Sequence, residues 1–151
     1  MRRAACGIAV AALAACGGGG GGSGTTQREG YAVDVTLLDF SISPGRTSVP
    51  GGKITFVVAN RGPDNAHEFL LLRTDLAADK LPTNADGSVN ETGEGITAVT
   101  EIETFPAGEI KETTVDLSAG KYVFVCNVVD AASTPAKVHY VLGMRAAFAA
   151  T

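Results

Sequence analysis

The chain has 151 residues, of which 45% are hydrophobic, and its 12 basic and 16 acidic residues give a formal net charge of −4 with histidine neutral. This length is sufficient for one ordinary domain. The basic residues form no cluster that could follow a phosphate backbone, so we exclude nucleic acid as a partner.

The N-terminus has the two parts of a secretory signal. Arg2 and Arg3 precede an apolar run, AACGIAVAALAAC, that is too short to span a bilayer. The run ends in LAAC at residues 13–16, which resembles a bacterial lipobox, the motif whose cysteine is lipidated and becomes the first mature residue. We therefore expect a signal peptide over residues 1–15 and a lipid anchor on Cys16. The alternative is that Cys16 is an ordinary small apolar residue near a cleavage site.

The segment after the signal is rich in glycine. Residues 16–30 contain GGGGGG followed by SGTTQREG, a composition that cannot pack a core and is typical of a flexible tether. We expect the folded domain to occupy residues 31–151. The lipobox resemblance implies that acyl chains hold it on the extracytoplasmic side of a bacterial cell membrane, periplasmic or outer-surface.

From Tyr31 onward the sequence predicts β-structure. The stretch YAVDVTLLDF has apolar residues at period two, and KITFVVAN and HEFLLLR are short runs of branched and aromatic residues. Similar runs follow: AVTEIETF, IKETTVDL, GKYVFVC, VHYVLG and MRAAFAA. Turn signals such as Ser43-Pro44-Gly45 and Pro50-Gly51-Gly52 separate them. Seven or eight such strands predict an all-β Greek-key sandwich or barrel.

Residues 74–97 interrupt this rhythm, because they are polar and show no period. Within them TDLAADKL favours a short helical turn capped by Thr74 or Asp75. A connection of this length is usually functional or mobile.

The middle third also concentrates acidic residues, which indicate a solvated face or, alternatively, a surface that attracts a basic partner. They are Asp75, Asp79, Asp86, Glu91, Glu94, Glu101, Glu103, Glu109, Glu112 and Asp116.

The predicted domain holds two histidines, one cysteine and one methionine: His67, Cys126, His139 and Met144. Because the other cysteines lie in the leader and at the lipobox, Cys126 has no disulfide partner; it is buried and inert, catalytic, or a metal ligand. Two imidazoles, a thiolate and a thioether are the ligand types of a blue-copper site. Thiolate and thioether favour Cu(I), whereas imidazole suits Cu(II), so such a site changes redox state with little rearrangement.

The order of these residues, within NAHEFLLL and GKYVFVCN…VHYVLGMRAAF, resembles the cupredoxins, and most closely the sulfocyanin-like and plastocyanin-like domains. The resemblance covers most of residues 31–151 and implies a single type 1 copper. It implies His67, Cys126 and His139 as equatorial ligands, Met144 as the axial ligand, and His139 as the exposed port for electrons.

One spacing departs from the family pattern. His139 and Met144 keep the usual gap of four residues, but twelve residues, NVVDAASTPAKV, separate Cys126 from His139 where plastocyanin-like proteins have two. At about 0.6 kcal/mol for each doubling of loop length, the insertion costs about 1.5 kcal/mol. A tight structural metal site contributes on the order of 10 kcal/mol, so the insertion is compatible with the site. It leaves the path of residues 127–138 and the exposure of His139 open.

Three neighbours of the predicted ligands are candidates for supporting them. Asn127 follows Cys126 and would brace the ligand loop through its amide, while Asn65 and Glu68 flank His67, where a hydrogen bond would orient an imidazole. For each of them a turn-forming or solvent-facing role is the alternative.

The pattern as a whole predicts a membrane-anchored extracytoplasmic carrier of single electrons that serves redox partner proteins as a monomer and has no small-molecule substrate. A copper-binding module for delivery or sequestration is the alternative, since it would use the same residues. An enzyme is disfavoured because both histidines are already used and no oxyanion motif accompanies a Cys126/His139 pair. A metal-free adhesion sandwich is the remaining alternative.

Overall fold

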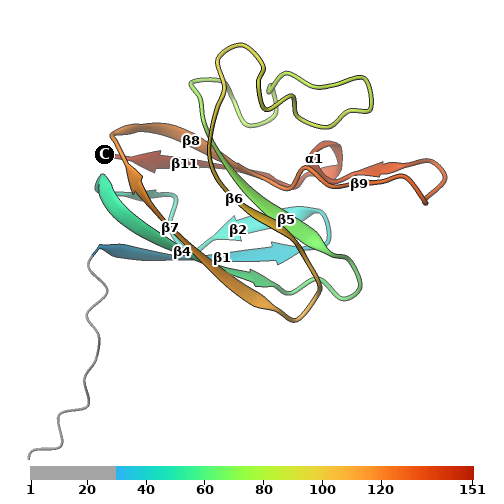
Figure 1. Cartoon of the computed structure of the whole chain (residues 1–151), viewed down its shortest axis with the longest axis horizontal. Coiled ribbons are helices and arrows are strands. Elements are labelled where there is room, and N and C mark those ends of the chain that lie inside the picture. Colours follow the sequence, from blue (N-terminus) through green and yellow to red (C-terminus); the bar gives the residue numbers. More distant parts are fainter. Residues whose placement is uncertain (1–29) are drawn as a thin grey trace, which may run out of the picture.

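A computed structural model describes residues 30–151. The predicted signal peptide and the predicted lipidation site at Cys16 lie outside the described residues. Within residues 30–151 the chain forms eleven strands and one four-residue helix, arranged as a sandwich of two sheets (Figure 1). The predicted all-β sandwich is confirmed. The strand number exceeds the expected seven or eight because three strands have only two residues each, too few to produce a periodic pattern.

The first sheet has the strand order β2-β1-β4-β7. Its strands are β1 (Tyr31–Leu38), β2 (Ser41–Pro44), β4 (Gly52–Asn60) and β7 (Ile110–Leu117). β1 runs parallel to β4, and the other pairs are antiparallel. The β1–β2 turn therefore lies at the end of the sheet where β1 finishes.

The second sheet has the order β3-β11-β8-β5-β6. Its strands are β3 (Ser48–Val49), β5 (His67–Arg73), β6 (Thr97–Phe105), β8 (Gly120–Val125) and β11 (Arg145–Ala150). A separate hairpin, β9 (Val129–Asp130) with β10 (Lys137–Val138), precedes the helix α1 (His139–Leu142). Because β5 and β8 are antiparallel neighbours, the first residue of β5 and the last residues of β8 share one end of the sandwich.

Apolar residues at period two fill the space between the sheets. On β1 and β4 the inward positions are fully or almost fully buried, and Phe56 lies 5.4 Å from Phe124 and 5.5 Å from Phe69, measured between ring centroids. The same core cluster extends to Cys126 and Met144. The candidate ligands are therefore part of the packed interior at one end of the sandwich.

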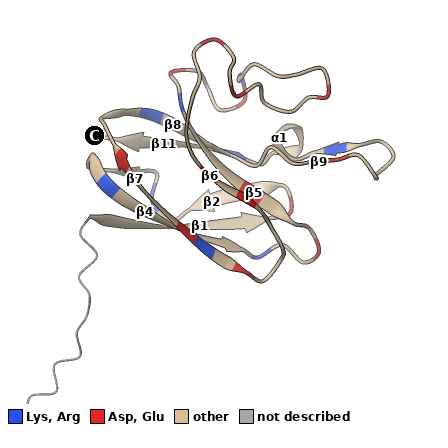
Figure 2. Ribbon diagram, in the orientation of Figure 1, with Lys and Arg blue, Asp and Glu red and all other residues tan. Residues whose placement is uncertain are grey.

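The acidic residues of the middle third lie on the 74–97 segment and on β6, β7 and the turn between them, and all except Glu91 are exposed (Figure 2). This placement agrees with the predicted solvated face. Among residues 30–151, no helix has the length and hydropathy needed to cross a bilayer.

Two local predictions were wrong. No helical turn forms at residues 74–81; instead the Thr74 hydroxyl accepts the Leu76 N–H at 3.1 Å, and Leu81 packs into a second apolar cluster on the outer face of β5 and β8. The stretch VHYVLG is not a strand, because the chain turns into α1 after Val138 and ends it at Gly143. Gly143 has φ of 126°, and a side chain there would place Cβ 2.8 Å from the Phe40 carbonyl oxygen.

Candidate metal centre

Three predicted ligands, far apart in the sequence, meet at one end of the sandwich. His67 is the first residue of β5, Cys126 follows β8, and His139 begins α1. The Nδ1 atoms of the two histidines are 3.2 Å apart, and Cys126 Sγ lies 3.4 Å from His139 Nδ1 and 3.9 Å from His67 Nδ1. All three side chains are buried.

Backbone hydrogen bonds place the fourth residue, Met144, beside Cys126. The Cys126 N–H donates to the Met144 carbonyl at 3.1 Å, which continues the pairing of β8 with β11. The Met144 N–H in turn donates to the His139 carbonyl at 2.9 Å. Met144 is fully buried, and it belongs to the same core cluster as Cys126.

The three donor atoms fit a metal ion. A point equidistant from atoms separated by 3.2, 3.4 and 3.9 Å lies about 2 Å from each, close to usual metal–nitrogen and metal–sulfur bond lengths. No other His, Cys, Asp or Glu side chain of residues 30–151 joins the group. Two imidazole nitrogens and one thiol, with a methionine adjacent, are consistent with one type 1 copper.

Burial favours the neutral form of each donor. It raises the pKa of the Cys126 thiol to about 11, although N–H groups of Glu68 and Val128 partly oppose this. Burial also lowers the pKa of His67, although the hydrogen bond and charge of Asp39 raise it. Burial likewise lowers the pKa of His139, and the neighbouring His67 lowers it further. At neutral pH a metal ion therefore meets two neutral imidazoles and displaces one thiol proton.

The twelve-residue insertion does not separate Cys126 from His139. Residues 127–138 leave the sandwich as the β9–β10 hairpin, which projects beyond α1 and returns (Figure 1). The His139 N–H then donates to the Val128 carbonyl at 3.0 Å, next to where the hairpin began. The inserted residues thus form a hairpin whose two ends lie together, so the length of the insertion has little effect on the ligand positions.

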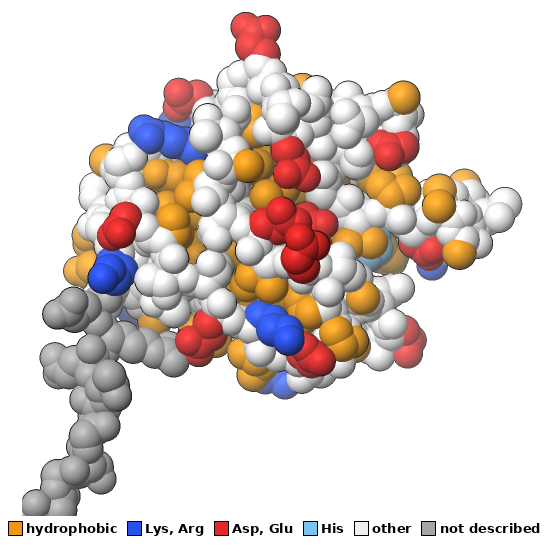
Figure 3. Space-filling model, in the orientation of Figure 1, with side chains coloured by type: hydrophobic (Ala, Val, Ile, Leu, Met, Phe, Trp, Pro, Cys, Tyr) orange, Lys and Arg blue, Asp and Glu red, His pale blue; other side chains and the backbone are white. Residues whose placement is uncertain are grey.

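His139 is only 2% exposed, in contrast to the exposed port that the family resemblance implied. Its ring packs against Phe40 with an interplanar angle of 86° and a centroid distance of 5.4 Å. The neighbouring Val141 and Leu142 are 57% and 46% exposed. Figure 3 shows a small area of histidine between hydrophobic side chains on this side of the molecule.

Sequence reasoning missed Asp39 and Phe40, which form the turn between β1 and β2. Asp39 Oδ1 lies 3.2 Å from His67 Nε2, while Phe40 contacts His139. Phe40 has φ of 65°, an uncommon value for a non-glycine residue. Only the pairing of β1 with β2 and β4 brings this turn over both histidines, so no local pattern pointed to it.

Of the three predicted supporting residues, Asn127 forms hydrogen bonds through its side-chain amide as expected, whereas Asn65 and Glu68 act differently from the expectation. Asn65 reaches His67 only indirectly, because its amide donates to Asp39 Oδ2 at 2.6 Å. The backbone N–H of Glu68, not its side chain, donates to Cys126 Sγ at 3.3 Å. Asn127 accepts the Val89 N–H at 2.6 Å and donates to the Val89 carbonyl and to Glu91 Oε1, which ties the chain after Cys126 to the 74–97 segment.

The Glu68 carboxyl group has an unusual environment for a side chain beside a ligand. Burial, together with Glu101, Glu91 and Glu103, raises its pKa to about 7. Its Oε1 atom is buried with no hydrogen-bond partner among residues 30–151. Glu68 therefore carries a proton more readily than an ordinary surface glutamate.

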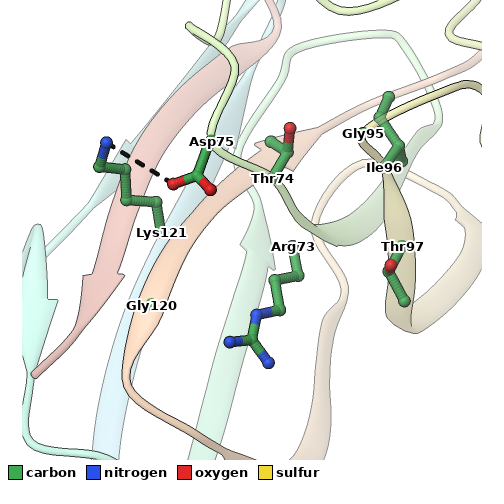
Figure 4. Close-up of a pocket in the computed structure, with 8 residues that line it drawn as sticks. All are labelled: Arg73, Thr74, Asp75, Gly95, Ile96, Thr97, Gly120 and Lys121. Carbon is green, nitrogen blue, oxygen red and sulfur yellow. Dashed lines mark ion pairs between the residues drawn. The ribbon is translucent and has the colours of Figure 1, made fainter.

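A pocket of about 380 Å³ lies at the opposite end of the same strands, between Arg73 and Lys121 (Figure 4). Arg73 donates to the Ser118 hydroxyl and the Ala119 carbonyl, and Lys121 pairs with Asp75 at 3.6 Å. None of the candidate ligands lines this pocket, so it is separate from the metal centre.

Solved structures similar to this chain include two auracyanins and an azurin. Auracyanin from Roseiflexus castenholzii, reduced with dithionite, matches with a TM-score of 0.54 and 15% identity over 80% of this chain and 96% of that one. Auracyanin B matches with a TM-score of 0.55 and 19% identity, over 80% of this chain and 88% of that one. An azurin from Methylomonas sp. strain J matches with a TM-score of 0.52 and 18% identity, over 80% of this chain and 97% of that one. No family model matches the chain, and no curated protein does. The chain therefore has the cupredoxin fold.

Proposed function

We propose that this protein is a membrane-anchored, extracytoplasmic one-electron carrier with a mononuclear type 1 copper. His67, Cys126 and His139 would hold the copper, and Met144 would be its fourth ligand. The observation that carries the proposal is the convergence of three buried donor atoms, all within 4.8 Å of one another, in a cupredoxin fold. When bound, the copper supplies the Cu(II)/Cu(I) couple, and the protein fixes the ligands.

The rigidity of the ligand positions favours electron transfer. Cys126 and Met144 are joined through a backbone hydrogen bond, and His139 is held at both its N–H and its carbonyl. Closely packed interiors resist small displacements, so such ligands move little between the two redox states. Full burial of the ligands also opposes rapid release of copper, which a delivery protein requires.

The position of the N-terminus is compatible with an anchor. The described chain enters the sandwich at Tyr31, and β1 ends at Leu38, next to the Asp39 that contacts His67. At about 3.3 Å for each residue, β1 separates its first residue from the metal centre by about 23 Å. A lipid on Cys16 would therefore leave the end of the sandwich that holds the copper free for a redox partner protein. The proposed carrier acts as a monomer and has no small-molecule substrate.

The proposal is tested by adding one equivalent of Cu(II) and then ascorbate to the purified full-length protein. We expect an intense visible thiolate-to-copper band that ascorbate bleaches and that Cys126→Ser abolishes. Asp64→Asn is the control, since it changes an exposed side chain outside the donor set and should keep the band. A colourless adduct contradicts the type 1 site, and rapid loss of Cu(I) to a chelator favours copper delivery over electron transfer.

The anchor needs its own test. Mass spectrometry of the protein from a bacterial membrane fraction should show acyl chains on Cys16 and no residues before it. Cys16→Ala should move the protein out of the membrane fraction. An unmodified N-terminus in the mature protein would contradict the lipoprotein assignment.

A further inference from the structure

The metal-facing histidine of β5 has a carboxylate on its far side. His67 Nε2 lies 3.2 Å from Asp39 Oδ1, and the second oxygen of Asp39 accepts the Asn65 amide at 2.6 Å. Because a carboxylate accepts hydrogen bonds, His67 donates its Nε2–H and leaves the lone pair of Nδ1 for the metal. Nδ1 is the nitrogen that faces Cys126 and His139.

The neighbouring loop is built around this contact. Asn60, which is fully buried, accepts the Gly62 N–H at 3.0 Å and donates to the carbonyls of Asn65 and Phe105. A side chain at Gly62 would place Cβ 2.5 Å from Asp39 Oδ1 and 3.0 Å from His67 Nε2. Close packing without a side chain at residue 62 therefore keeps the carboxylate against the imidazole.

A carboxylate in this position changes the properties of the metal that the imidazole holds. It makes the imidazole a better electron donor and adds negative charge close to the ion. Cu(II) gains more from both effects than Cu(I) does, because it carries the higher charge. Since the side chain of Asp39 is 24% exposed and that of His67 is fully buried, the contact is only partly screened by solvent.

We propose that Asp39 is a positioning residue that lowers the reduction potential of the copper by stabilising Cu(II) through His67, and that Asn65 holds Asp39 in place. This inference rests on the proposed function, because it requires copper at the His67, Cys126 and His139 site.

The test uses Asp39→Asn in the full-length protein, which keeps the shape and one acceptor oxygen and removes the charge. Loss of such a partner usually lowers metal affinity by about 10- to 100-fold. We expect Cu(II) affinity to fall about tenfold more than Cu(I) affinity, which for one electron raises the midpoint potential by about 59 mV. Spectroelectrochemical titration gives the potential, and competition titrations give the two affinities.

Two further variants separate the contact from simple charge removal. Asp64→Asn removes an exposed carboxylate from the β4–β5 loop, next to Asn65, and should leave the potential unchanged. Asn65→Ala keeps the charge of Asp39 but frees the carboxylate, so the potential should rise by a smaller amount.

Several outcomes overturn the inference. The first is an unchanged potential in Asp39→Asn when the blue band is intact, and the second is an equal shift of the potential in Asp64→Asn. If circular dichroism shows that Asp39→Asn does not fold, an unchanged potential in Asn65→Ala overturns the inference instead. Absence of the blue band in the unmodified protein would instead refute the proposed function.

Discussion

At the scale of single residues, the candidate site is defined by which atom of each side chain faces inward. Both histidines present Nδ1 to Cys126 Sγ, and the sulfur receives the Glu68 N–H. Burial keeps the thiol protonated by raising its pKa to about 11 and keeps the imidazoles neutral by lowering theirs. Only the proton on the thiol competes with a metal at neutral pH.

This protonation state predicts how copper binding depends on pH. Each Cu(II) bound near pH 7.5 should release about one proton, and the apparent affinity should rise about tenfold per pH unit between pH 7 and 9. The sign follows because the folded thiol pKa lies above this window, so raising the pH removes the competing proton. Calorimetry in buffers of different ionisation enthalpy measures the protons released. Binding without proton release would mean that the thiolate already exists in the metal-free protein.

At the scale of elements, the 74–97 segment supports the chain that carries Cys126. Its residues Leu81 and Val89 pack with Tyr140 in the second apolar cluster, and the Leu81 N–H donates to the Tyr140 hydroxyl at 3.1 Å. Asn127 adds hydrogen bonds to Val89 and Glu91. The segment is therefore a structural cover for the outer face of β5 and β8, and it contacts Asn127 and Tyr140, which immediately follow Cys126 and His139.

Asn127→Ala should destabilise the metal-free protein by about 1–3 kcal/mol, because it leaves the buried Val89 N–H without its partner. The blue copper band should survive, since β8 and α1 still hold the ligands. Denaturant unfolding followed by circular dichroism measures the change. Asn90→Ala is the matched control, because its bonds to Thr92 are exposed and its loss should cost about 0.5 kcal/mol or less. Equal losses in the two variants would contradict the proposed support.

At the scale of the whole molecule, the candidate site joins parts of the chain that are remote in sequence. A metal bound there would link β5, the end of β8 and α1, and would bind the folded state much better than the unfolded state. At a free copper concentration 100 times the Kd, this linkage contributes about 2.7 kcal/mol of stability.

Addition of Cu(II) should therefore raise the midpoint of thermal unfolding by roughly 10 °C for a domain of this size. Differential scanning calorimetry of the full-length protein measures the shift. Cys126→Ser should lose most of it, because the thiolate is the strongest donor of the set. A similar rise in that variant would show that copper binds elsewhere.

The sequence alone determined the class of fold and the members of the candidate site. Apolar residues recur at every second position along β1 and β4, and this pattern predicts that one face of each strand is buried. The pattern depends only on local residue type, so it can be read from the sequence. The ligand set followed from residue types and their order, and His67, Cys126 and His139 do converge. The same local reasoning failed for residues 74–81 and 138–143, where contacts with distant residues override propensity.

Only the tertiary structure decided how the site is supported and covered. Asp39 and Phe40 reach the two histidines because β1 pairs with β2 and β4 in one register. The β9–β10 hairpin closes on itself, which brings His139 back to Cys126 in spite of the twelve-residue insertion, and Phe40 packs over the His139 ring. These relations depend on strand register and on packing between residues remote in sequence, and a local pattern carries no information about either.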